Sequence, residues 1–373
     1  MEPKLKLIDH YLIWQNADVV QIRAQQKTLL LRGELVRHFF SQVLALLDGR
    51  YTQNEILAIL NQHEHAAQLQ GLFAVLQQKE LLAPVEACPS ALQHLPSGKL
   101  EALARFFANY SSSAWQTITM LQQCRVLLFG QPELLIPIAL GLSHLMVGQI
   151  CLMANPVTAA DCAHSRYLTD ADIGLHPAAV VQRLVAGELC SAIVATDGYP
   201  DSVLDWRQQL QPFDLIITAD SQPIIFNDML AELNQAVLLT GTRWLPLAVI
   251  DNKELQLGPA ILPGQTACYK CFEYRLRSNL SHLEHYDAFA ETFNSLKQRP
   301  DFGVLAPFSE LLANYAVLEA MKLLSDDYSA ISIGKLQTFS LDQFNNQSHP
   351  VLKIPRCPHC SEFSARCPER IWG

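Results

Sequence analysis

The chain has 373 residues, of which half are hydrophobic, and a formal net charge of −9. This length is sufficient for two domains, and the acidic balance without a basic stripe or aromatic platform excludes nucleic acid as the main partner. The first residues carry no export signal and no apolar run reaches the ~20 residues that span a bilayer, so we expect a cytoplasmic protein without a membrane contact.

The N-terminal part of the sequence begins with short β-rich segments. Three apolar, β-branched runs at 11–14, 19–23 and 28–32 are separated by polar turn residues. Runs of this length and composition are typical of strands, and their short connections favour neighbouring antiparallel pairs. We therefore expect a three-stranded antiparallel sheet at the start of the chain.

Helical periodicity follows the third strand. Apolar residues recur at three- and four-residue steps over 35–47, and Asp48 and Gly49 end that pattern. Thr52 with Glu55 three residues later predicts a capping box for a second helix, and 66–79 forms a third amphipathic segment. We therefore predict a separate small α+β domain over residues 1–85, with three helices after the sheet.

This order of elements, with the hinge segment LLDGRYTQNEILAIL running from the end of the first helix into the second, resembles the PqqD-like peptide-recognition element over about residues 5–83. The resemblance implies a winged-helix-like domain in which the leader segment of a precursor peptide adds as a strand to the third strand and packs beside the third helix. Four backbone hydrogen bonds of about 0.5–1.5 kcal/mol each do not reach the roughly 8 kcal/mol of micromolar affinity, so side chains must contribute. The residues implied in peptide binding are Thr28, Leu29, Leu30, Leu31, Arg32, Leu69, Leu72, Phe73 and Leu76.

Two other interpretations of the first domain remain open. It could be a winged-helix DNA-binding domain, or a structural domain whose leucines all belong to its core. Few basic residues cluster in this segment, which argues against DNA. Some of the leucines implied in peptide binding are expected to be core residues in any case.

A buried strand over 125–129 ends at Gly130, as the first strand of a nucleotide-binding Rossmann-like unit does. Such units continue with a G-x-G-x-x-G turn whose backbone N–H groups bind phosphate. Here Pro132 lacks an N–H group, and Glu133 is expected to place a negative charge where phosphate would bind. The sequence therefore predicts that the nucleotide site is lost and that ATP is not a cofactor.

Two aspartates, Asp214 and Asp220, flank the apolar strand at 215–218. In nucleotide-binding α/β domains the end of such a strand lies over the nucleotide, but an aspartate at a strand end is also a common helix cap. We favour the helix cap for this sequence.

Two C-x-x-C pairs, Cys268 with Cys271 and Cys357 with Cys360, predict a metal site. Zn²⁺ binds four thiolates tetrahedrally, and a C-x-x-C turn supplies two of them. A redox pair or chance proximity is the alternative, but the second pair, with Pro358 and His359 between its cysteines, favours zinc. A closed four-cysteine site leaves no position for substrate, so we expect a structural zinc whose binding contributes on the order of 10 kcal/mol to folding.

Three segments in a fixed order surround these features: HSRYLTDADIGLHPAAV at 164–180, FDLIITADSQPIIFNDML at 213–230 and LGPAILPGQTACYKCFEYR at 257–275. Together they resemble the ThiF/MoeB superfamily of adenylating enzymes, and more closely its degenerate branch, the partner proteins of YcaO cyclodehydratases. The resemblance covers roughly 100–373. It implies a Rossmann-like α/β fold for a second domain over 86–373, with Cys268, Cys271, Cys357 and Cys360 as zinc ligands.

The ATP-binding residues of that superfamily are not present at the matching positions. The segment 153–156 reads Met-Ala-Asn-Pro where the superfamily has aspartates, and Pro177 stands where a lysine reaches the phosphates. Arg166 is at most a remnant of the arginine that active members of the superfamily have, together with a glutamine, in this part of the sequence. Loss of one preorganised charge-stabilising donor costs about 3 to 4 kcal/mol, so loss of several implies adenylation slowed by ~10⁴-fold or more. We therefore assign no catalytic and no cofactor-binding residue.

The two resemblances together imply a noncatalytic zinc-containing subunit that binds the leader peptide and presents the precursor to a YcaO-type ATP-dependent cyclodehydratase. The product would be an azoline- or azole-containing peptide of the bacteriocin type, with an azoline dehydrogenase as a further partner. An apolar helix at 311–324 is compatible with a homodimer, by analogy. One alternative is an active adenylyltransferase acting on a peptide or carrier-protein C-terminus, and another is a protein that delivers a peptide to a different modifying enzyme.

Overall fold

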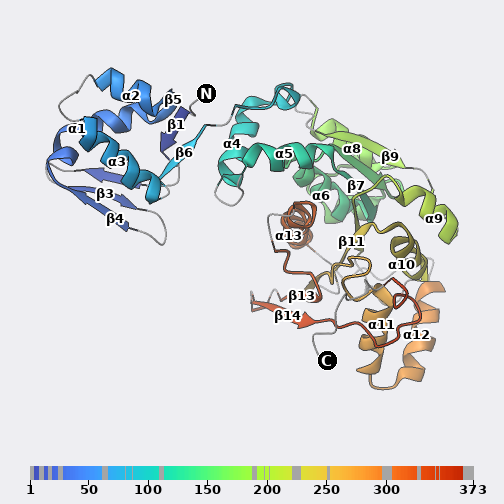
Figure 1. The fold of residues 1–373 in the computed structure, drawn as a ribbon. Coiled ribbons are helices and arrows are strands. Elements are labelled where there is room, and N and C mark those ends of the chain that lie inside the picture. The colour runs from blue at the N-terminus through green and yellow to red at the C-terminus, as the bar shows by residue number, and fades with distance from the viewer. Residues whose placement is uncertain are drawn as a thin grey trace, which may run out of the picture. The chain divides into compact units, whose positions relative to one another are not determined.

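In the computed structural model the chain forms two compact units, Met1–Gln93 and His94–Gly373 (Figure 1). Each unit has its own hydrophobic core. The division lies a few residues beyond residue 85, where the sequence suggested a domain boundary. The residues that the structure describes are 4–7, 12–15, 19–23, 28–60, 66–79, 81–85, 87–108, 113–186, 191–196, 198–200, 202–220, 228–249, 253–295, 305–325, 329–340, 342–343 and 345–363.

The first unit contains two small antiparallel sheets. One is the expected meander, in the order β2-β3-β4, and the other has the order β5-β1-β6. The second sheet was not predicted, because it pairs the start of the unit with its middle and its end. The strands are β1 Lys4–Leu7, β2 Leu12–Gln15, β3 Val19–Arg23, β4 Thr28–Arg32, β5 Asp48–Thr52 and β6 Leu82–Pro84.

Three helices, α1 Glu34–Leu46, α2 Gln53–Leu60 and α3 Ala66–Gln78, complete this unit as the periodicity predicted. The capping box of α2 is formed, since the Glu55 amide donates to Thr52 Oγ1 (3.2 Å) and the Thr52 amide donates to Glu55 Oε2 (2.8 Å). The alternation of β3 buries every second residue against apolar residues of all three helices, so sheet and helices share one core.

The second unit is built on an eight-stranded mixed sheet in the order β14-β13-β12-β11-β10-β7-β8-β9. Strands β11, β10, β7, β8 and β9 are parallel, and β12, β13 and β14 add antiparallel pairs. The central strands are buried on both faces, as their continuous apolar runs predict. The strands are β7 Arg125–Gly130, β8 Gln149–Met153, β9 Ala192–Thr196, β10 Leu215–Asp220, β11 Arg243–Val249, β12 Glu254–Leu257, β13 Lys335–Ser340 and β14 Asn345–Pro350.

Helices connect the parallel strands and cover the sheet (Figure 1). Among them, α6 and α13 pack closely, because Gly141 leaves room for the Val317 side chain. No helix in the described part of the chain is both long and apolar enough to cross a membrane. The helices are α4 Ser97–Phe107, α5 Ala114–Gln123, α6 Pro132–His144, α7 Ala159–His164, α8 Pro177–Leu184, α9 Val203–Leu210, α10 Asp228–Thr240, α11 Tyr269–Ser278, α12 Leu283–Ser295 and α13 Ala306–Leu324.

The order of the strands changes direction at β7, which is the topological switch point of the sheet. The segment after β7 leads to β8 and β9 on one side, whereas β10 and β11 lie on the other side. Beyond the carboxyl ends of β7 and β10 this arrangement leaves the crevice in which parallel α/β sheets bind ligands.

Candidate functional site

A cavity of about 390 Å³ lies at the carboxyl ends of β7 and β10. Gly130 ends β7 at a φ of +140°, and a Cβ there would lie 1.9 Å from the Ala219 carbonyl oxygen of β10, so glycine is required for the two strands to approach. Phe129, Tyr199 and Leu247 provide apolar walls. The cavity therefore has the place and the size of a small-ligand site.

The polar lining of this cavity combines the carboxylates of Asp161 and Asp220 with uncharged amide and hydroxyl groups, which belong to Gln131, Asn155, Thr158, Tyr199 and Thr218. Asp161 Oδ2 accepts hydrogen bonds from the Thr158 amide (2.6 Å) and the Thr158 hydroxyl (2.7 Å) in the capping box of α7. Asp220 lies at the end of β10, and Thr218 Oγ1 accepts from Trp244 Nε1 (2.9 Å). None of the described lining residues is a lysine or an arginine, so nothing in that set neutralises a phosphate.

Glu133 lies in the first turn of α6 beside this cavity, directly after Pro132. Burial raises the pKa of its carboxyl to about 8, and a hydrogen bond with Asp161 and the charges of Asp161 and Asp220 act in the same direction. Glu133 is therefore mainly protonated at pH 7. The expectation that Glu133 itself carries a negative charge is wrong at neutral pH, because its neighbours and its burial favour the neutral form.

The two aspartates that flank β10 have different positions. Asp214 lies at the amino ends of the central strands, where its Oδ2 accepts a hydrogen bond from the Arg125 amide (2.8 Å) and joins the starts of β7 and β10. Asp220 lines the cavity, and the next described helix, α10, begins only at Asp228, so Asp220 does not cap that helix. The sequence signal for Asp220 was an aspartate at the carboxyl end of a buried strand; no pattern pointed to Tyr199.

The segment that resembles the D-I-G-x-x-K motif serves local structure. Asp172 caps a short 3₁₀ turn with Thr169 and pairs with Arg183 at 2.8 Å. Pro177 is the first residue of α8, and His176 Nδ1 accepts a hydrogen bond from the Ala178 amide (3.1 Å). No residue of this segment lines the described part of the cavity.

The four predicted cysteines form a buried cluster. Their Sγ atoms lie within 4.8 Å of one another, with 4.0 Å between Cys268 and Cys357 and 3.6 Å between Cys271 and Cys360. Tetrahedral Zn–S bonds of about 2.3 Å require sulfur atoms about 3.8 Å apart. The donor set and its spacing therefore fit zinc, and the metal-ligand prediction is confirmed as far as a four-cysteine group that could hold a metal.

Backbone amides and neighbouring thiols around this cluster fix the position of the cysteines and affect the pKa of their thiols. The Ile354 amide donates to Cys271 Sγ (3.4 Å), and the Tyr269 amide between the first two cysteines donates to Asn234 Oδ1 (2.9 Å). A hydrogen bond from Cys268 lowers the pKa of Cys271, whereas burial raises the pKa of Cys360. A metal cation would favour ionisation of the thiols that bind it.

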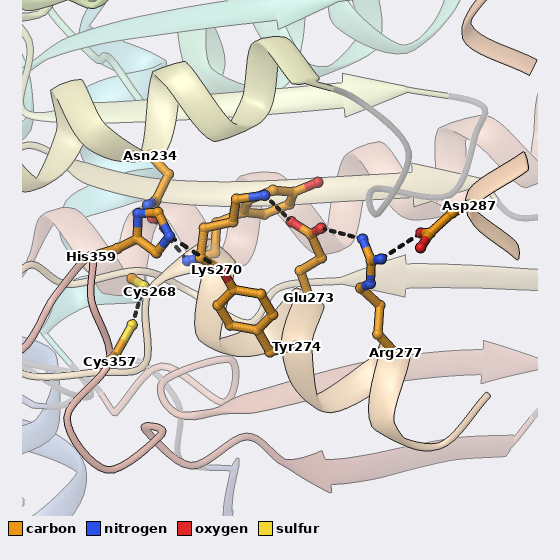
Figure 2. A network of polar contacts seen from close by, with 10 residues as sticks. Asn234, Cys268, Lys270, Glu273, Tyr274, Arg277, Asp287, Cys357 and His359 are labelled. Atoms are coloured by element: carbon orange, nitrogen blue, oxygen red, sulfur yellow. Dashed lines mark hydrogen bonds and ion pairs between the residues drawn. The ribbon is translucent and has the colours of Figure 1, made fainter. Parts of the chain in front are cut away.

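A polar network extends from the cluster along α11 to α12 (Figure 2). The buried carboxylate of Glu273 lies between Lys270 (2.7 Å) and Arg277 (3.4 Å), and Arg277 also pairs with Asp287. Tyr274 Oη contacts His359 Nε2 at 3.4 Å, which joins α11 to the second C-x-x-C turn. The cluster and this network hold α11, α12 and the 357–360 turn together, as a structural site does.

The residues implied in peptide binding are divided between an edge strand and the core of the first unit. Strand β4 is at the edge of its sheet, and Leu30 is 51% exposed. The four residues of α3, in contrast, belong to the hydrophobic core and can form at most the floor of a groove; they are Leu69, Leu72, Phe73 and Leu76. Peptide binding by either set stays a prediction.

Comparison with solved structures places the chain in a class of mixed α/β folds. No family model matches the chain, and no curated protein matches its sequence. Solved structures do match, and they share a mixed α/β architecture over almost the whole chain. The prediction of an α/β domain with a four-cysteine site is confirmed at this level, while the winged-helix nature of the first unit remains a prediction.

The matching structures include MccB of E. coli and the heterocyclase TruD. MccB with succinimide covers 96% of this chain and 99% of its own, at a TM-score of 0.68 and 13% identity. The microcin C7 biosynthetic enzyme MccB in complex with N-formylated MccA matches at a TM-score of 0.67 and 16% identity, with the same coverage. TruD matches at 0.59 and 18% identity, and this chain spans only 43% of it. MccB has also been solved with ATP, so the fold gives no support to the expected absence of ATP.

Proposed function

We propose that the chain binds a precursor peptide through its first unit and presents it for modification, without itself forming an adenylate. The observation that carries this proposal is the cavity at the ends of β7 and β10, where Asp161 and Asp220 are present and the described lining has no lysine or arginine. A triphosphate that enters this cavity would lie beside carboxylates, without a cation among those lining residues to offset their repulsion.

The first unit supplies a surface for the peptide. The edge strand β4 offers backbone groups to an added strand, and the leader of a precursor would bind there. Binding of the leader keeps the remainder of the precursor near a modifying enzyme at an effective concentration in the millimolar range. We propose a YcaO-type ATP-dependent cyclodehydratase as that enzyme, with an azoline dehydrogenase acting on its product, in agreement with the similarity of the fold to a heterocyclase.

The four cysteines Cys268, Cys271, Cys357 and Cys360 would hold zinc, which contributes folding free energy here. A closed set of four protein ligands leaves no position for a water molecule or a substrate carbonyl. The metal would therefore keep the second unit in the conformation that docks the modifying enzyme, and the chemistry would take place on that partner.

A homodimer is also part of the proposal. On α13, Leu311, Tyr315 and Leu318 are spaced by four and three residues, and all three are at least one third exposed. Apolar residues in such a row are typical of a covered helix face. The molar mass of the purified chain, measured by light scattering, distinguishes a dimer from a monomer.

A second candidate function is adenylation, and two observations favour it. Asp220 lines the cavity, where its carboxylate could bind the Mg²⁺ that accompanies a nucleotide. MccB, which has a similar fold, has been solved with ATP. Protonation of Glu133 also removes one of the charges that would repel phosphate.

Peptide-dependent ATP–pyrophosphate exchange separates the two functions. The zinc-loaded chain is first shown by fluorescence anisotropy to bind a candidate precursor, and exchange is then measured with that peptide bound. We expect exchange at the background rate, the same for the wild type and for Asp220→Asn. Exchange above background that is lost in Asp220→Asn would replace the scaffold function with adenylation.

A further inference from the structure

The outward face of the sheet β2-β3-β4 has a distinctive charge pattern beside the outer edge of β4. Successive side chains of a strand point to opposite faces, so Thr28, Leu30 and Arg32 share one face and Leu29 and Leu31 share the other. The first three are exposed, whereas the last two are half-buried and pack on the core. The edge strand therefore presents an apolar residue flanked on the exposed face by a hydroxyl and a guanidinium.

The neighbouring strand adds a second positive charge to this face. In the antiparallel register Leu30 pairs with Gln21, and Thr28 pairs with Arg23, which is also exposed. Leu30 thus lies between Arg32 on its own strand and Arg23 diagonally across on β3. Neither β3 nor β4 contains an acidic residue. This face is basic although the whole chain has a net charge of −9.

From this pattern we infer that the peptide bound at β4 is selected by an aliphatic residue opposite Leu30 and an acidic residue two positions away, opposite Arg32. The inference rests on the proposed function and adds the chemistry that the partner must have. Residues two apart on an added strand lie on the same face, so the carboxylate and the aliphatic side chain would both be on the exposed face. Residues on the other face would meet Leu29 and Leu31 and should be apolar.

The size of the effect follows from the exposure of the residues. Cross-strand pairs on an open face change stability by about 0.2–1 kcal/mol, which corresponds to no more than about fivefold in affinity for each pair. The ionic part of the preference should decrease as salt concentration rises, because both partners are in contact with water.

A selection experiment with the full-length chain tests this inference. A bacterial-display library of random dodecapeptides is sorted for binding to the wild type, to Arg32→Glu and to Lys79→Glu. Lys79 is exposed and follows α3, outside both sheets, so its replacement makes the same charge change at a different place. We expect Asp or Glu two positions from Leu, Ile or Val among binders of the wild type and of Lys79→Glu, and Lys or Arg at that position for Arg32→Glu.

Individual peptides from the sort then provide affinities. Replacing the acidic residue by lysine should weaken binding to the wild type by about two- to fivefold and strengthen binding to Arg32→Glu. Binders without an acidic preference, or the same preference for Arg32→Glu, would overturn the inference and leave peptide binding intact. If no peptide is retained by any folded variant, the proposed function fails as well.

Discussion

Glu133 is a residue whose chemistry depends on its surroundings more than on its type. Its carboxyl lies beside Asp161 and Asp220 and is removed from water, which raises its pKa to about 8 from 4.5. Below pH 4.5 the group is protonated in the folded and the unfolded chain alike. As the pH rises from 4.5 to about 8 only the unfolded chain loses the proton, so the free energy of unfolding decreases, and the decrease is complete above about pH 8.

The replacement Glu133→Gln removes this titration while keeping the size of the side chain. Relative to the wild type, we expect the variant to gain on the order of 4 kcal/mol of unfolding free energy at pH 8.5 and less than about 1 kcal/mol at pH 5. Urea denaturation at the two pH values measures the difference. Glu101→Gln, at an exposed position of α4, serves as the control. Equal gains at both pH values would show that Glu133 is ionised in the folded chain.

At the level of single residues, the sequence predicted a site whose members are close together in the chain. It did not predict a site whose members come from distant segments. The C-x-x-C pairs are recognisable from a short stretch of sequence, and their four sulfur atoms are together in the structure. Glu133, Asp161, Tyr199 and Asp220 come from four separate segments that only the parallel sheet brings to the cavity and its border. The protonation of Glu133 was not predictable, because it depends on these distant neighbours.

At the scale of elements, the approach of β7 to β10 defines the cavity. A Cβ atom at Gly130 would lie 1.9 Å from the Ala219 carbonyl oxygen, and its φ of +140° is unfavourable for other residues. We expect Gly130→Ala to destabilise the second unit by about 3 kcal/mol or more, since a backbone atom cannot rotate away.

Thermal denaturation of Gly130→Ala and of Gly98→Ala measures this effect. Gly98 lies in the first turn of α4, and a Cβ added there would have no other group within 4 Å, so alanine should be neutral or stabilise by up to about 1 kcal/mol. Equal midpoints for the two variants would mean that β7 and β10 separate at little cost and that the cavity is not rigid.

Local patterns predicted most elements of the first unit, including the meander, the three helices and the capping box of α2. They did not predict the sheet β5-β1-β6. Strand β5 has the polar sequence DGRYT, which suggested a helix end, and its partner β1 also pairs with β6 at the far end of the unit. Pairings between distant segments depend on the closed fold, which propensity and periodicity within a short window do not contain.

At the scale of the whole molecule, the edge strand proposed for peptide binding and the cavity belong to different units. The first unit has a core from β3 and its three helices, and the second has a core that includes the four cysteines. The proposed presenting function requires such a division, since a bound leader would stay in place while the remainder of the precursor is modified.

The cysteine cluster joins segments that are distant in the second unit, since 85 residues lie between Cys271 and Cys357. Replacing one ligand should release the metal and free the 357–360 turn from α11. We expect Cys360→Ser to contain less than one zinc per chain by elemental analysis and to unfold with a free energy lower by about 3 kcal/mol or more. Cys162→Ser, outside the cluster, should keep both zinc and stability.

The same measurement decides between a zinc site and a redox pair. A chelator should lower the unfolding midpoint of the wild type toward that of Cys360→Ser, because the metal binds only the folded chain strongly. Thiol titration after denaturation without reductant should then find all four cysteines of the cluster reduced, since zinc binds thiolates. A zinc-free wild type of full stability whose clustered cysteines escape titration would instead identify disulfides, and the joining of α11 to the 357–360 turn would then be covalent.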